Sequence, residues 1–171
     1  MFGSLFTSSP SDFPASVDAT SADLPFDFKR FFTGDVEGWG VFHGRNQHAD
    51  QHFSAAMHTK WLSSDEAILN EDFIWSDGRK QERKWHITFE DTDRFTATAD
   101  DIIGKAYGLI EDNALRMSYE MIVTRASGQK INLTFDDRLY RVSEKSIINK
   151  TLIKKFGIHI GSLSSAFVKA G

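Results

Sequence analysis

Acidic residues stand in this sequence where apolar ones are expected. Three acidic pairs lie within or at the ends of segments that alternate polar and apolar residues: Glu71-Asp72, Asp100-Asp101 and Asp136-Asp137. In each pair one carboxylate shares the apolar phase of its segment, and these are Glu71, Asp101 and Asp137. Because successive side chains of a strand point to opposite faces, the phase predicts that these three carboxylates face the core.

A buried charge is costly unless it is paired, so these acids require partners. Arg83 shares the phase of Trp85 and Ile87 and is the basic counterpart. We expect Arg83, Lys105 or tyrosine hydroxyls within hydrogen-bond reach of at least two of the acids. In such a network, Asp137→Ala strands the charge of its partner and destabilises the fold by roughly 3–5 kcal/mol, with Asp136→Ala as the out-of-phase control.

Two interpretations of the acids stay open. They can form an interior polar cluster that binds a ligand head group or performs acid–base chemistry. They can equally form a salt-bridged network that fixes strand register, or lie at strand ends and face water.

Aromatic residues are numerous, at 13% of the chain, and either line a cavity or fill the core. Together with the interior polar residues they give the candidate ligand-binding set: Trp39, Glu71, Arg83, Trp85, Asp101, Tyr119, Phe135, Asp137 and Tyr140.

No metal site or cofactor is predicted. His52 and His58 lie six residues apart in one strand phase, which separates their side chains by about 20 Å. Cysteine is absent, which excludes disulfides, thiolate metal sites and cysteine nucleophiles. The glycine pairs Gly104/Gly108 and Gly157/Gly161 lack the Lys-Ser/Thr of a phosphate-binding loop.

The segments that must position these residues are strands. All three prolines fall in the first 25 residues, and the proline-free remainder carries period-two segments separated by turn residues. This pattern predicts an all-β fold: an antiparallel up-and-down barrel of about 8–10 strands, lipocalin-like, closed so that no edge is left open. Residues 1–25 are expected to form a flexible N-terminal arm and residues 26–171 the barrel, with a short helical turn at Asp27–Gly34 plugging one end.

Charge and composition limit the binding partners and the cellular locations that we expect for this chain. The net charge is −4, which argues against a nucleic-acid or anionic-membrane surface. No apolar run approaches the roughly 20 residues of a membrane span. We read no basic n-region and no long apolar h-region near Met1, so a cytoplasmic location is expected.

From about Phe31 onward the chain resembles DUF3833, a bacterial family of unknown function. The matching stretches are Phe32-Thr33-Gly34 with Trp39-Gly40-Val41-Phe42, Glu71-Asp72-Phe73 with Ser76-Asp77-Gly78, Arg83-x-Trp85, Thr98-Ala99-Asp100-Asp101 with Gly104-x-Ala106-x-Gly108, Asn113-Ala114-Leu115-Arg116 with Tyr119, Phe135-Asp136-Asp137 with Leu139-Tyr140, and Ile148-Asn149-Lys150 with Lys155-Phe156-Gly157. The resemblance implies a calycin-type barrel similar to lipocalins. Many members look like envelope lipoproteins, which suggests an association with the cell envelope, although this sequence has no lipobox cysteine.

Three functions are therefore weighed. The leading hypothesis is a non-catalytic barrel that binds a small apolar or amphipathic molecule, with lipids among the candidates. The second is a cofactor-free isomerase or lyase in which Asp101 or Asp137 is the general acid or base and Tyr119 or Tyr140 the hydrogen-bond donor. The third is an interaction scaffold without a ligand. The oligomeric state is not predicted.

Overall fold

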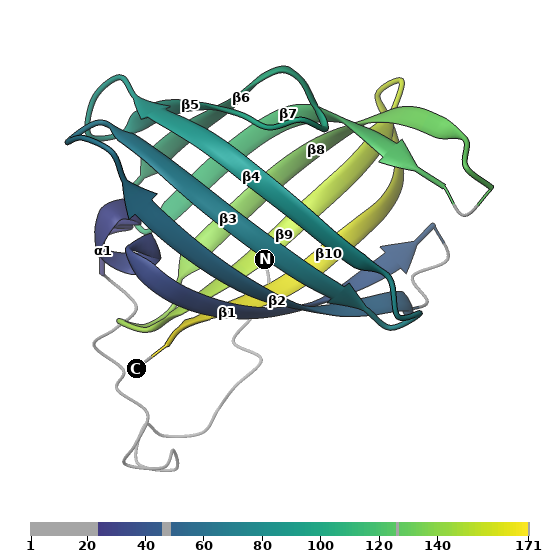
Figure 1. Ribbon diagram of the computed structural model, residues 1–171, viewed down its shortest axis with the longest axis horizontal. Coiled ribbons are helices and arrows are strands. Elements are labelled where there is room, and N and C mark those ends of the chain that lie inside the picture. Colours follow the sequence, from purple (N-terminus) through teal and green to yellow (C-terminus); the bar gives the residue numbers. More distant parts are fainter. Residues whose placement is uncertain (1–23, 46–48, 126, 171) are drawn as a thin grey trace, which may run out of the picture.

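The computed structural model describes residues 24–45, 49–125 and 127–170 and contains ten strands and one short helix over those residues (Figure 1). The elements are α1 (Phe28–Phe32), β1 (Gly34–Gly44), β2 (Ala49–Trp61), β3 (Glu66–Trp75), β4 (Lys80–Phe89), β5 (Arg94–Thr98), β6 (Ile102–Glu111), β7 (Ala114–Thr124), β8 (Lys130–Arg141), β9 (Ser146–Lys155) and β10 (Ile158–Lys169). No helix in this part of the chain is long and apolar enough to cross a lipid bilayer.

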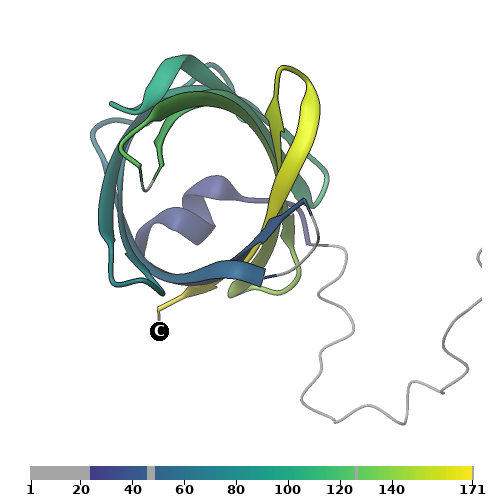
Figure 2. The same ribbon diagram turned by 90° about the vertical axis from the view of Figure 1, so that its right-hand side faces the viewer.

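The strands form a closed antiparallel barrel, which confirms the predicted fold class. Each strand pairs with its neighbour in sequence, and β1 pairs with β10 from Val36↔Lys169 to Gly44↔Gly161 to close the ring (Figure 2). Closure gives every strand two partners, which leaves no open sheet edge for another chain. Of the predicted arm, only residues 24 and 25 lie within the described residues.

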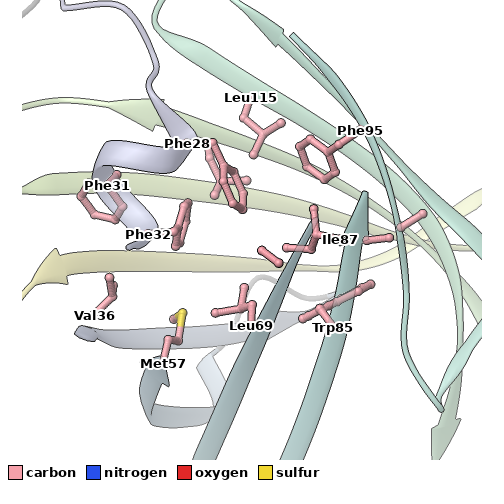
Figure 3. Packing of buried hydrophobic residues seen from close by; sticks show 14 of the residues in the cluster. Phe28, Phe31, Phe32, Val36, Met57, Leu69, Trp85, Ile87, Phe95 and Leu115 are labelled. Atoms are coloured by element: carbon pink, nitrogen blue, oxygen red, sulfur yellow. The ribbon is translucent and has the colours of Figure 1, made fainter. Parts of the chain in front are cut away.

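Helix α1 closes one end of the barrel, as the sequence predicted. Asp27 caps the helix by accepting a hydrogen bond from the Arg30 backbone N–H at 2.9 Å. The phenylalanines of α1 point into the barrel, and the Phe28 ring lies 5.4 Å from Phe89 and 5.3 Å from Phe95, centroid to centroid (Figure 3). This end is therefore sealed by aromatic packing.

Two glycines make this inner packing possible. A Cβ atom added at Gly108 would lie 2.2 Å from the Phe95 ring, and one at Gly40 would lie 2.3 Å from the Phe53 ring. Both distances are far below van der Waals contact, so the rings lie directly on the bare backbone of β6 and β1.

The turn between β9 and β10 gives a stability prediction. Its two central residues, Phe156 and Gly157, have φ values of 51° and 77°, the left-handed conformation in which tight hairpin turns favour Asn-Gly. Phe156 is 92% exposed, so its ring stabilises little. We expect Phe156→Asn to raise the free energy of unfolding by about 0.5–1 kcal/mol in chemical denaturation, because asparagine tolerates this backbone better.

Phe156→Ala is the matched control, since it removes the same ring without relieving the backbone. An asparagine variant no more stable than the alanine variant would contradict the strain argument.

Candidate functional site

A polar cluster lies on the inner wall of the barrel, between α1 and the opposite end. Glu71 on β3 and Arg83 on β4 are cross-strand partners, with 3.5 Å between Arg83 Nη1 and Glu71 Oε2. Trp85 Nε1 donates to the same Glu71 oxygen at 3.0 Å. The side chains of Glu71 and Arg83 are only 14% and 10% exposed, so this is a largely desolvated ion pair.

Asp101 is the second partner of Arg83. Arg83 Nε donates to Asp101 Oδ1 at 3.1 Å and Arg83 Nη2 donates to Asp101 Oδ2 at 2.9 Å, a bidentate geometry typical of strong guanidinium–carboxylate pairs. The sequence analysis assigned Asp101 to the end of a strand, but β5 ends at Thr98 and Asp101 lies in the link to β6. The inward orientation predicted from the phase is nevertheless present, because the Asp101 carboxylate reaches the inward Arg83 side chain.

Asp137 on β8 has only uncharged donors. The Thr151 hydroxyl, on the facing position of β9, donates to Asp137 Oδ1, and Asn149 Nδ2 donates to the same atom at 3.4 Å. The Tyr119 hydroxyl is a third donor to this carboxylate. The prediction that Arg83 or tyrosine hydroxyls reach at least two of the acids is confirmed.

Aromatic rings connect the two sides of the cluster. Tyr119 packs edge-on against Trp85, at 5.5 Å between ring centroids, and stacks on Phe135 at 5.4 Å with an angle of 2° between the rings. Seven of the nine candidate residues are thereby brought together: Glu71, Arg83, Trp85, Asp101, Tyr119, Phe135 and Asp137.

The other two candidates lie elsewhere. Trp39 is 49% exposed and Tyr140 is 39% exposed, because each occupies the outward phase of its strand, β1 and β8. Including them with the interior residues was wrong. Lys105 is also exposed and takes no part in the cluster.

The sequence analysis missed Asn149 and Thr151, which complete the site. Both are buried, and both alternate with Ile147 and Ile153 along β9. That alternation was readable in the sequence, where two polar residues stand in an apolar phase, the same signal that located the acids.

Burial controls the protonation of the site. Desolvation raises the pKa of Glu71, which the nearby Arg83 partly opposes, and the pKa of Asp137, which its hydrogen bonds from Thr151, Tyr119 and Asn149 partly oppose. Desolvation also raises the pKa of the Tyr119 hydroxyl, so tyrosine remains a donor at neutral pH. On the outer face the opposite holds, since Lys154 lowers the pKa of Asp136 from 2.6 Å away.

The end of the barrel opposite α1 is more open. Along β3 the inward side chains pass from buried, at Ala67 and Leu69, to half-buried, at Glu71, Phe73 and Trp75. Strand β4 repeats this gradient in the reverse direction, because it is antiparallel to β3. The barrel wall shields inward side chains from the outside, so their residual exposure points to the open end.

Two hollows in the described part of the chain lie away from this cluster. One, of about 510 Å³, lies beside the β9–β10 turn and is lined in part by Glu120, Lys130 and Phe156. The other, of about 200 Å³, includes Arg116 and Tyr140. Over the described residues, no group of three or more His, Asp or Glu side chains is arranged to hold a metal ion.

The profile of one family, described as "Protein of unknown function (DUF3833)", matches residues 9–169. The chain belongs to the DUF3833 family. The resemblance inferred from separate motifs is thus confirmed over nearly the whole chain. None of the curated proteins matches this DUF3833 chain in sequence.

Solved structures share its fold. The S-type phycobiliprotein lyase CPES from Guillardia theta is similar with a TM-score of 0.61 at 9% identity, covering 84% of this chain and 90% of the lyase. A protein of unknown function from the DUF3598 family of Nostoc punctiforme gives 0.62 at 11% identity, covering 91% of this chain but only 53% of its own length. Rv2717c from M. tuberculosis gives 0.54 at 9% identity, covering 82% and 93%. At these identities the likeness extends to the barrel fold alone.

The contacts of Asp137 in this DUF3833 barrel revise the stability prediction made from sequence. Its donors are neutral, so Asp137→Ala strands no charge but leaves the Thr151, Asn149 and Tyr119 donors without their acceptor. We expect a loss of about 2–3 kcal/mol in thermal or chemical denaturation, below the effect of an orphaned charge. Asp136→Ala, which removes a half-exposed pair on the outer face, should cost less than about 1 kcal/mol. Equal effects of the two variants would contradict the inward placement.

The raised pKa of Asp137 predicts a pH dependence. A carboxyl group with a higher pKa in the folded than in the unfolded state binds its proton more tightly when folded. The stability that the Asp137 carboxyl group contributes therefore falls as the pH rises from its pKa in the unfolded chain to its higher pKa in the folded protein. Asp137→Asn lacks this titration, so its stability relative to wild type should increase from about pH 4 towards neutrality.

Asp136→Asn should show the opposite sign. Its pKa is lowered in the folded state, so the wild-type carboxylate gains stability as the pH rises to its ordinary pKa, and Asp136→Asn should become less stable than wild type over that acidic range only. Unfolding curves of the three proteins from about pH 2 to pH 7 cover both ranges, the one below about pH 4 for Asp136 and the one above it for Asp137. Parallel curves for both variants would refute the assignment.

Proposed function

We propose that this protein is a binding barrel that holds a small amphipathic molecule in its open half, with the apolar part on the aromatic wall and the polar part on the interior cluster. The observation that supports this most directly is the gradient of exposure along β3 and β4, whose inward side chains change from buried near α1 to half-buried towards the opposite end. Known small-molecule sites combine an apolar wall with a few convergent polar groups in the same way.

The wall of this half is aromatic. Phe73 and Trp75 on β3, Tyr119 on β7 and Phe135 on β8 all face inward and stay half-buried. Arg83 lies between the rings of Phe73 and Trp85, with its Cζ atom 5.8 and 5.7 Å from their centroids. Rings held in this way by cation–π and stacking contacts present a firm apolar surface beside the charged groups.

The experiment is the binding of N-phenyl-1-naphthylamine, a neutral apolar probe whose fluorescence rises in apolar surroundings. We expect saturable binding that Val123→Trp abolishes, because Val123 points inward near the open end of β7. Thr124→Trp is the matched control, since the adjacent residue is exposed on the outer face. Binding that fails to saturate, or that survives both substitutions equally, would overturn the proposal.

One observation favours a catalytic use of the same cluster as a second candidate. Asp137 combines a raised pKa with a hydrogen bond from Tyr119, the pairing that general acid–base catalysis needs. Asp101 is less suited, because Arg83 holds it in a bidentate pair, and Tyr140 lies on the outer face. A ligand that co-purifies with the protein, incubated with it in D2O, should then gain deuterium at carbon with wild type but not with Asp137→Asn.

A further inference from the structure

We infer that the polar end of the bound molecule is a hydrogen-bond donor, best a primary ammonium, and that it contacts Asp137, Asn149 and Ser165 on the β8–β10 wall. This inference rests on the proposed function and names the chemical class of its ligand.

The first observation is the balance of charge in the open half of the barrel. Three inward carboxylates, those of Glu71, Asp101 and Asp137, share one guanidinium. Arg83 directs its N–H groups at Glu71, Asp101 and the Met121 sulfur, so it is committed to groups already present. The other buried arginine, Arg141, donates to the backbone carbonyls of Pro25 and Ser143 near α1.

Asp137 is therefore the interior acid without a cationic partner in direct contact. Its donors are a hydroxyl from Thr151, an amide from Asn149 and the Tyr119 hydroxyl. A cation entering from the open end would complete an ion pair here, whereas an incoming carboxylate would meet a like charge.

The second observation is independent of charge. Asn149 uses its amide nitrogen for Asp137 and Thr151, which leaves the oxygen Oδ1 buried without a partner. Ser165 is the cross-strand neighbour of Asn149 on β10, and its Oγ is likewise buried and unpartnered. The two residues are only 6% and 5% exposed, so bulk water does not satisfy them.

Asn149 links the two sides of this site, because its amide nitrogen donates to Asp137 on β8 and its cross-strand neighbour on β10 is Ser165. Buried polar groups are normally hydrogen-bonded, and the exceptions call for a missing partner. An amide oxygen and a carboxylate both accept hydrogen bonds, so the partner that suits them is a donor. The Ser165 hydroxyl can rotate about its Cβ–Oγ bond and accept a hydrogen bond from the same donor. An ammonium group, with three donors and a positive charge, meets all three residues at once.

The test compares dodecylamine, dodecanol and dodecanoate, which share one alkyl chain and differ in the head group. Each competes with N-phenyl-1-naphthylamine for the wild-type protein at neutral pH. We expect the order amine, alcohol, carboxylate, with the amine bound at least about tenfold more tightly than the carboxylate.

Variants locate the head group. Asp137→Asn should remove the advantage of the amine over the alcohol, and Asp136→Asn, on the outer face, should retain it. Ser165→Ala is a small change that keeps the test possible if Asp137→Asn does not fold, and it should weaken the amine and the alcohol alike.

The failures can be told apart. If the probe does not bind to the wild-type protein, the proposed function is wrong. If all three displace it equally, or dodecanoate binds best, the barrel binds amphipathic molecules but the donor inference is wrong.

Discussion

Replacing Arg83 with methionine should lower the free energy of unfolding by about 3–5 kcal/mol. Arg83 is the guanidinium that pairs two inward carboxylates, bidentate to Asp101 and at 3.5 Å to Glu71. Methionine preserves much of the apolar stem, so the loss reflects chiefly two desolvated acids left without a cation.

Chemical denaturation of the wild type and two variants provides the measurement. Arg94→Met is the matched control, because Arg94 pairs with Asp91 on the exposed surface and its loss should leave the unfolding curve unchanged. Adding Glu71→Gln to Arg83→Met should restore part of the lost stability by removing one of the orphaned charges. Similar curves for the two methionine variants, or no recovery in the double variant, would refute the network.

Much of the fold was predictable because one face of nearly every strand is apolar. The closed barrel was predicted from this pattern, and the plug was predicted at Asp27–Gly34, the segment that contains α1. Strand β1, Gly34–Gly44, is the exception. Its inward positions include Gly38 and Gly40, which a search for alternating apolar residues does not count as apolar. Glycine is nevertheless needed there, because the rings of Phe167 and Phe53 occupy the space that a side chain would fill.

The same glycines explain the misplacement of Trp39. A tryptophan between two glycines suggests a buried ring, yet the glycines take the inward phase and the ring lies outside. Strand periodicity located Glu71, Arg83 and Asp137 correctly, because a charged residue breaks an otherwise apolar face. Strand periodicity did not reveal that Arg83 forms its bidentate pair with Asp101, because Asp101 lies in a link between strands and the path of a link depends on tertiary packing.

The two ends of the barrel differ in the kind of side chain that faces inward. Near α1 the inward side chains are mostly apolar, with the buried Arg141 bonded to the Pro25 carbonyl, whereas the inward carboxylates gather away from that end. A network whose role was only to fix strand register would be more stable if every member were satisfied. The unpartnered oxygens of Asn149 and Ser165 fit a site that is completed by another molecule.

This division predicts that stability depends strongly on the α1 plug. Phe28→Ala should cost about 3–5 kcal/mol, because the ring is 5% exposed and packs against Phe32, Phe89 and Phe95, so its removal leaves a cavity in the aromatic core.

Phe156→Ala is the matched control: the same atoms are removed from a ring that is 92% exposed, so the change should be within about 0.5 kcal/mol. Thermal melts of the two variants decide the matter, and similar melting temperatures would show that α1 is not part of the core. If the plug does hold the closed end, a folded Phe28→Ala protein should still bind the naphthylamine probe at the open end, because the residues of the polar cluster come from the barrel strands and the β5–β6 link rather than from the helix.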